Sequence, residues 1–243
     1  GVALGRSLAE RALAPGHCAE HRLSRRVVFA TSRLLFFARN VMRPTRNVSN
    51  RAGCEASPRA ALSPADWIAA ATDVLVKKGV DSIKIDLLSK DLGVTKGSFY
   101  WHFSNRDDLL RHVLLRWREL QTEVQIARYR AEAKRGELRV RELAELPFRG
   151  HAAERGAAVE LAIRAWARRD EMARQVVDEV DATRLSYLTD LFSSLDCSAD
   201  EAAARAFLLY SYMQSEALFY RQGTDRAKGK RRHFTVELLL GGI

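Results

Sequence analysis

The sequence is poor in cysteine, in proline and in long apolar runs. It has three cysteines, Cys18, Cys54 and Cys197, a small and odd number that does not suit a disulfide framework. Such a count is typical of proteins in a reducing cytoplasm. No run of 18 apolar residues occurs, so we predict no membrane-spanning helix and no membrane partner. Five prolines among 243 residues favour helices over strands. The sequence therefore predicts an all-α protein of the cytoplasm.

Acidic residues are scarce in the first 62 positions, which hold eleven arginines, no lysine and three glutamates. This segment accounts for +8 of the formal net charge of +10 and leaves only +2 for residues 63–243. Its apolar residues lack periodicity and its first Met is Met42, so we expect a disordered extension or a stretch upstream of the true start. The alternatives are an organelle transit peptide and a basic arm that grips DNA.

Motifs of enzymes and of metal sites are also lacking. The sequence has no glycine-rich phosphate loop and no Ser/His/Asp constellation, and His17, Cys18 and His21 have no fourth metal ligand beside them. We therefore expect no enzyme activity, no cofactor and no metal.

What the sequence does contain is a succession of helix signals from Ser63 onward. Ser63 can cap a helix that has Pro64 at its first position, and Gly79 is a natural stop. A pair of short helices follows, and then six helices are predicted: from 104 or 105 toward 130, and at 137–148, 154–168, 171–195, 199–222 and 227–240. The predicted organisation is an extension at 1–62, an N-terminal three-helix domain at 63–115 and a second helical domain at 116–243.

Residues 86–101 have the pattern of a helix-turn-helix. One short helix is predicted at 86–92, Gly93 permits a left-handed turn, and Thr95 can cap a second short helix at 96–101. The residues expected to face inward are Leu87, Leu88, Leu92, Phe99 and Phe103.

The outward face of the second short helix carries more aromatic and basic groups than mere solvation explains. Such groups can reach phosphates and the thymine methyl group in the major groove of DNA. Arg106 begins the next helix, where its side chain and the free N–H groups can hold a phosphate together. The alternative is a helical hairpin whose aromatic residues pack against a neighbouring domain. The residues predicted to contact DNA are Lys84, Thr95, Lys96, Gly97, Ser98, Tyr100, Trp101, His102 and Arg106.

The segment GVTKGSFYWHFSNRDDLL at 93–110, preceded by a capped helix that ends at Gly79, resembles the DNA-binding domain of the TetR-like transcriptional regulators. The resemblance is specific over residues 63–115 and covers 120–243 only as architecture. It implies an all-helical fold of about nine helices and an operator of double-stranded DNA as the partner.

The resemblance also implies roles for single residues. Lys96, Gly97 and Ser98 would meet bases or nearby phosphates, and the aromatic side chains at 100–102 would contact the backbone and the groove edge. Arg106 would replace the usual lysine phosphate anchor. The sequence departs from the family at Lys84, where a Ser or Thr cap is common, and at Asp86, where a basic residue is frequent.

The last two predicted helices have apolar residues near heptad spacing, which favours a four-helix dimer interface. The alternative is that these residues only complete the core of a monomer. The predicted interface residues are Ala206, Leu209, Met213, Ala217, Tyr220, Phe234 and Leu238. The resemblance further implies a cavity for a small-molecule inducer, with Phe148, Trp166 and Tyr187 as its candidate lining, although an ordinary packed core is the alternative for each.

The resemblance, together with these patterns, implies a homodimeric, ligand-responsive repressor that regulates transcription. Its two recognition helices would bind a palindromic operator until a small-molecule inducer releases it. Two other classes were weighed: an enzyme, which no motif supports, and a helical interaction protein that has kept the domain but lost operator binding. Asp86 is the residue that favours the latter class.

Overall fold

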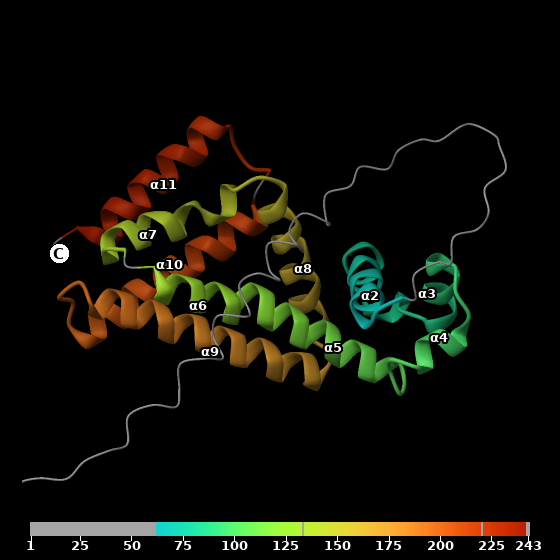
Figure 1. Ribbon diagram of the computed structural model, residues 1–243. Helices are drawn as coiled ribbons and strands as arrows, with labels where there is room; N and C mark the ends of the chain where they lie inside the picture. The colour runs from blue at the N-terminus through green and yellow to red at the C-terminus, as the bar shows by residue number, and fades with distance from the viewer. Residues whose placement is uncertain (1–61, 133, 220, 242–243) are drawn as a thin grey trace, which may run out of the picture. The chain divides into compact units, whose positions relative to one another are not determined.

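The computed structural model describes residues 62–132, 134–219 and 221–241, and these residues form helices without any strand (Figure 1). The predicted all-α fold is therefore confirmed. Cys18, Cys54, the group His17–Cys18–His21 and Tyr220 lie outside the described residues. The helices are α2 (Pro64–Lys78), η1 (Val80–Ser82), α3 (Ile85–Leu92), α4 (Lys96–Tyr100), α5 (Arg106–Arg118), η2 (Glu119–Glu123), α6 (Val124–Ala131), α7 (Gly136–Glu145), η3 (Leu146–Phe148), α8 (His151–Ala167), α9 (Glu171–Ser193), α10 (Ala199–Leu218) and α11 (Asp225–Leu240).

Helix α2 begins and ends as its sequence predicts. The Asp66 carboxylate accepts hydrogen bonds from the backbone N–H and the hydroxyl group of Ser63, at 2.8 and 2.7 Å. This arrangement satisfies groups at the free N-terminus, and Pro64 occupies the first position, where no N–H is needed. Gly79 ends the helix with a φ of 82°, a backbone conformation that residues with a Cβ rarely adopt.

The turn between α3 and α4 is formed at Gly93, whose φ of 68° and ψ of 33° are the predicted left-handed conformation. The N–H group of Val94 closes the turn by donating to the Ser89 carbonyl at 3.0 Å. Leu88 is buried as predicted, but the inward prediction for Leu87 is wrong because half of its side chain is exposed. The buried side of α3 is formed by Leu88 and Ser89, and Leu87 lies about 100° from Leu88 and about 200° from Ser89 around the helix axis.

Helix α5 is capped by Asn105, whose side chain accepts from the Asp108 N–H at 2.9 Å. From Arg106 the chain continues through η2, a turn of π-helix, directly into α6. The predicted long helix toward residue 130 is thus present, but with a π-helical turn at Glu119–Glu123. Such turns insert an extra residue into the helical repeat and are frequent at functional sites.

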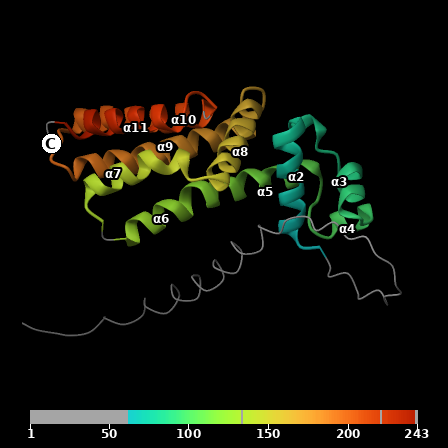
Figure 2. The same cartoon turned by 90° about the horizontal axis from the view of Figure 1, so that it is seen from above.

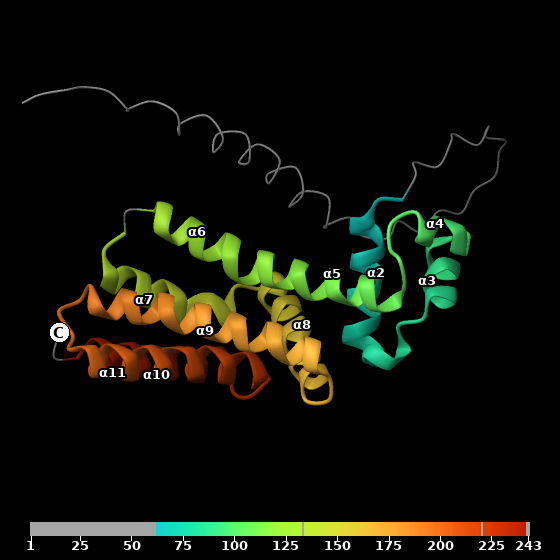
Figure 3. The same cartoon turned by 90° about the horizontal axis from the view of Figure 1, so that it is seen from below.

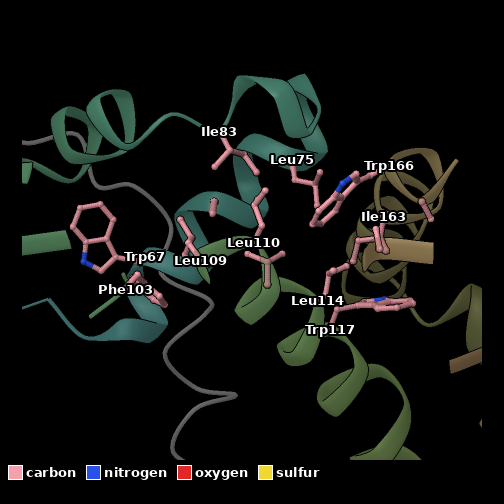
Figure 4. Close-up of a cluster of buried hydrophobic side chains, with 14 of the residues drawn as sticks. Trp67, Leu75, Ile83, Phe103, Leu109, Leu110, Leu114, Trp117, Ile163 and Trp166 are labelled. Atoms are coloured by element: carbon pink, nitrogen blue, oxygen red, sulfur yellow. The ribbon is translucent and has the colours of Figure 1, made fainter. Parts of the chain in front are cut away.

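Two clusters of buried side chains hold the described residues together. The first joins α2, α3, α4 and α5 to α8 and α9, and Figure 4 shows it extending from Trp67 and Phe103 to Trp117 and Trp166. The second joins α6, α7, α9, α10 and α11. The predicted boundary at residues 115 and 116 falls inside α5, which packs against both α2 and α9.

The second cluster positions the helices that follow α6. Helices α9 and α10 pack along each other, and α10 and α11 lie side by side at the edge of this layer (Figures 2 and 3). Arg205 of α10 donates to the carbonyls of Leu239 and Gly241, so the first half of α10 is fixed beside the end of α11.

Candidate nucleic-acid interface and ligand cavity

Helix α4 is fixed on the fold by two phenylalanines. Phe99 and Phe103 are buried as predicted, and the Phe99 ring meets the Trp67 ring edge-on with 5.3 Å between centroids. On the opposite side, 58% of Tyr100 and 87% of Trp101 are exposed. Large aromatic side chains are seldom left this exposed by a surface that binds nothing.

Lys96 and Asp86 form an ion pair across the helix-turn-helix, with the Lys96 Nζ atom 2.6 Å from the Asp86 Oδ1 atom. The hydrogen bond from Lys96 to Asp86 raises the pKa of the lysine, which therefore stays charged. Both side chains are more than half exposed, and Lys96 and Tyr100, four residues apart on α4, share one face of the helix. Asp86, the departure from the family pattern, is thus the direct partner of the first residue of α4.

The start of α4 leaves room for close approach. Thr95 precedes the helix and is exposed, but its side chain makes no capping hydrogen bond. A Cβ atom added to the exposed Gly97 would meet only the Thr95 Oγ1 atom, at an ordinary contact distance of 3.5 Å. Ser98 is partly buried, and Lys84 is exposed at the residue before α3. These four residues stay predicted DNA contacts.

Arg106 is placed differently from the prediction. Its Nε atom donates to the Ile83 carbonyl and its Nη2 atom to the Val80 carbonyl, both at 2.7 Å. Two of its three nitrogens therefore tie the start of α5 to the loop around η1. The phosphate contact stays a prediction for the remaining Nη1 atom, which lies 3.6 Å from Asp107.

His102 is a correction. It was predicted to face outward, but it is partly buried and its Nε2 atom lies 2.9 Å from the Leu62 carbonyl, within hydrogen-bond distance. The imidazole thus connects the end of α4 to the residue just before the Ser63 cap. The contact spans 40 residues of sequence, which explains why helical periodicity alone did not reveal it.

A cavity of about 430 Å³ lies between η2, α6, α7, η3, α8, α9 and α10, a size within the usual range for small-molecule sites. Its apolar wall includes Ile126, Leu143, Leu146, Leu188 and Met213. Its polar wall includes Gln121, Thr122, Gln125, Arg128, Tyr129, Arg149, Glu160, Arg184, Tyr187, Tyr210 and Gln214.

Glu160 is a buried carboxylate in the cavity lining, of which 7% is exposed. Its Oε1 atom accepts from Arg164 Nε and Arg184 Nη1, each at 2.9 Å, and from Gln214 at 3.2 Å. Burial by itself would raise the pKa of Glu160, but the charges of Arg184 and Arg164 outweigh burial and lower it. The carboxylate is therefore ionised and shared between two arginines.

Asp181 and Tyr210 complete this network. Arg164 holds the Asp181 carboxylate with two nitrogens at 2.5 and 2.9 Å, and the Tyr210 hydroxyl donates to Asp181 at 2.6 Å. Burial raises the pKa of Tyr210, so its hydroxyl keeps the proton that it donates. Arg184 reaches the π-helical turn, where its Nε atom donates to the Thr122 hydroxyl at 3.0 Å.

The candidate cavity residues have mixed outcomes. Tyr187 lines the cavity, where its ring stacks on that of Tyr129 with 6.2 Å between centroids. The prediction for Trp166 is wrong, because this residue is 3% exposed and belongs to the first buried cluster. Phe148 also lies outside the lining, beneath the guanidinium group of Arg232. Sequence reasoning missed Glu160 and Arg184, although the alternation of acids and arginines along 160–184 is a usable signal.

The predicted dimer residues separate into three groups. Ala206 and Leu209 are fully buried in the second cluster, so these two are corrected from interface to interior. Met213 and Ala217 are partly buried and line the cavity, and their place in an interface stays a prediction. Phe234 and Leu238 are 71% and 63% exposed on α11, as an interface requires. Two exposed residues of α10, Phe207 and Leu208, were not predicted.

Membrane and metal features were searched over the same residues. Within 62–132, 134–219 and 221–241, no helix is long and apolar enough to span a bilayer, and no three His, Cys, Asp or Glu side chains are grouped as metal ligands. Cys197 is a free, partly buried thiol.

The short helix pair with a buried Phe99 and an exposed aromatic face defines a helix-turn-helix protein with an all-helical second part. Residues 68–113 match the family model for bacterial regulatory proteins of the tetR family. The helix-turn-helix segment of this chain is therefore similar to that family.

An HTH-type transcriptional repressor of Mycobacterium tuberculosis is 38% identical over 52 residues, which are 21% of this chain and 20% of the relative. The chain thus spans about a fifth of the length of the curated relatives that it matches. The regulator FadR from Bacillus subtilis, solved with stearoyl-CoA, has a TM-score of 0.54 at 17% identity, covering 74% of this chain and 100% of that one. A transcriptional regulator from Saccharomonospora viridis, solved with choline, has a TM-score of 0.58 at 17% identity, covering 74% and 96%. These two structures share the fold.

Proposed function

We propose that the protein is a transcriptional regulator that binds operator DNA through the exposed face of α4. The observation that carries the proposal is the contrast within this helix: Phe99 is fully buried while Trp101, two residues later, is 87% exposed. The core therefore holds α4 rigidly while its other face offers Lys96, Tyr100 and Trp101 to a groove. The relatives matched over this segment are described as transcriptional regulators, which favours this function over an enzyme.

The test is binding of a duplex selected by the protein from a random-sequence library, measured by fluorescence anisotropy beside a scrambled duplex. Lys96→Ala combined with Tyr100→Ala should abolish the preference for the selected duplex. Lys230→Ala is the matched control, because it removes one charge from exposed α11, away from α4 in Figure 1. Unchanged preference in the double variant would remove α4 from the interface. If no duplex is selected at all, the helical interaction protein becomes the better description.

A homodimer is part of the proposal, with Phe207, Leu208, Phe234 and Leu238 as its contact surface. Phe207 and Leu208 lie near the middle of α10, and Phe234 and Leu238 lie in the second half of α11, the helix to which Arg205 connects α10. A two-fold axis through this surface would present two α4 helices to one palindromic duplex, whose half-sites are about 34 Å apart. Repression by such a dimer would be released by a ligand in the 430 Å³ cavity. Ligands in two structures of the same fold support this role for the cavity.

A further inference from the structure

The cavity lining includes members of two charged clusters that differ in net charge. The inner quartet, defined as Glu160, Arg164, Asp181 and Arg184, has two carboxylates and two guanidinium groups in mutual contact. It is electrically neutral, so a ligand gains nothing by bringing a charge to it. Adding an ion there would instead break contacts of 2.5–2.9 Å that are already made.

The outer cluster has an excess of positive charge. It consists of Arg128, Glu132, Lys134, Arg139, Glu142 and Arg149, which are four cations and two carboxylates. The neighbouring pairs Arg130–Asp190 and Arg232–Glu145 are balanced and leave this excess of two charges unchanged. Two cations of this cluster, Arg128 and Arg149, line the cavity. Each is about half exposed at the cavity mouth.

The carboxylates of the outer cluster are held by the cations that do not line the cavity. Glu142 lies 2.5 Å from Arg139 and 2.9 Å from Lys134, but 3.3 Å from Arg149. Glu132 lies 3.0 Å from Arg139 but 3.8 Å from Arg128. The two cavity arginines therefore have the longest and weakest contacts with the shared carboxylates, and their remaining N–H groups can serve an anion.

Part of the remaining wall is apolar. Ile126, Leu143 and Leu188 face the cavity, and Leu146 and Met213 extend this surface. An occupant that fits the whole site needs an apolar body against this wall and a negative end at the mouth. Arginine recognises planar oxyanions such as carboxylate, as well as phosphate, with two parallel hydrogen bonds.

We propose that the cavity binds an amphipathic organic anion whose acidic group meets Arg128 and Arg149 and whose apolar body lies against Ile126, Leu143 and Leu188. This inference rests on the proposed role of the cavity as the ligand site, and it adds the chemical class of the ligand. Carboxylates and phosphate monoesters share the required chemistry.

The test is calorimetric titration of the full chain, without DNA, with probes that share a ten-carbon tail: decanoate, decyl phosphate, 1-decanol and decyltrimethylammonium. At least one anion should bind about ten-fold more tightly than the alcohol, and the cation most weakly, because one charge-assisted hydrogen bond contributes about that factor. The preferred anion distinguishes a carboxylate ligand from a phosphate ligand. Equal affinity for alcohol and anions, preference for the cation, or no binding by either anion would overturn the proposal.

Variants locate the anion. Arg149→Gln and Arg128→Gln should each weaken binding of the preferred anion by about three- to thirty-fold and leave 1-decanol unchanged. Arg174→Gln, on exposed α9 and outside the cavity, is the matched control and should change nothing. Loss of anion affinity in Arg174→Gln alone would place the site elsewhere. Because these titrations contain no DNA, their outcome is independent of operator binding, which is scored separately by release of the selected duplex.

Discussion

Asp86→Asn should strengthen DNA binding rather than weaken it. In the free protein the Lys96 Nζ atom lies 2.6 Å from the Asp86 carboxylate, so the pair brings no net charge to the face of α4. The amide side chain of the variant keeps the shape of aspartate but leaves Lys96 with its full positive charge. Because both side chains are well exposed, the substitution should leave the fold intact.

The size of the effect follows from counterion release. One added positive charge at the DNA steepens the dependence of log affinity on log salt by about 0.9, and by about 1.8 for a dimer with two copies. Per protomer this corresponds to about eight-fold tighter binding at 0.1 M salt and about four-fold at 0.2 M. The gain should be equal for the selected and the scrambled duplex, because a phosphate contact carries no sequence information.

Anisotropy titrations of both duplexes between 0.05 and about 0.3 M salt measure the slope directly. Asp178→Asn is the control, since it removes the same charge from the exposed surface of α9. Screening over about 10 Å at 0.1 M salt should keep its effect small. A loss of affinity for the selected duplex alone in Asp86→Asn would refute the electrostatic reasoning. That result would mean that the carboxylate accepts a hydrogen bond from a base, as from the amino group of cytosine.

Three further variants test other parts of the molecule. Gly97→Ala should raise the free energy of unfolding by about 0.5–1 kcal/mol, because the added methyl group meets only Thr95 at 3.5 Å, yet it should weaken operator binding. Thermal melting measures the change in stability, and anisotropy measures the change in operator affinity. Equal or tighter binding would show that no DNA group approaches the backbone at Gly97. Phe234→Glu should make the protein monomeric in sedimentation velocity while changing its stability little. Leu209→Ala, in contrast, should lower the free energy of unfolding by about 2–5 kcal/mol. If the Phe234→Glu variant stays dimeric, the interface lies elsewhere. Glu160→Gln should cost about 3–5 kcal/mol at neutral pH, because it leaves two partly buried arginines with one carboxylate fewer. The folded-state pKa of Glu160 is below its ordinary value. The stability that the ionised carboxylate contributes is therefore present at pH values above that ordinary value and is lost as the pH falls through the lowered pKa. Denaturant titrations in acid should show a smaller loss of stability with falling pH in the variant than in the unsubstituted protein.

The helix-turn-helix was predictable because its signals are local. The Ser63–Pro64 start, the left-handed Gly93 and the spacing of Phe99 and Phe103 each act within a few residues, and each was confirmed. The outward residues were less predictable where a distant group competes for them. His102 contacts a carbonyl 40 residues away and Arg106 contacts carbonyls 23 and 26 residues away, which no helical period encodes.

The second half was predictable as helices but not as surfaces. An apolar stripe on α10 fits a monomer core and a dimer interface equally well, because both bury the same residue types. Ala206 and Leu209 belong to the core, and the exposed apolar residues Phe207 and Leu208 are their immediate neighbours in sequence. Successive residues lie about 100° apart around the helix axis, so one can face the core while the next faces solvent. Only the packing of α10 against α9 determines which residues of α10 face the core.

The π-helical turn η2 connects the cavity to the DNA-binding unit. Gln121 and Thr122 belong to this turn and line the cavity, while the helix that leads into it begins at Arg106, six residues after α4 ends. Arg184 bonds both to Thr122 and to Glu160, so one side chain joins the turn to a buried carboxylate in the cavity lining. A ligand that moved Gln121 or Thr122 would act on η2 without touching α4. Because α5 carries both the η2 junction and the Arg106 tie to the η1 loop, a change in the bend at η2 would move the α4 helix relative to its counterpart in a dimer.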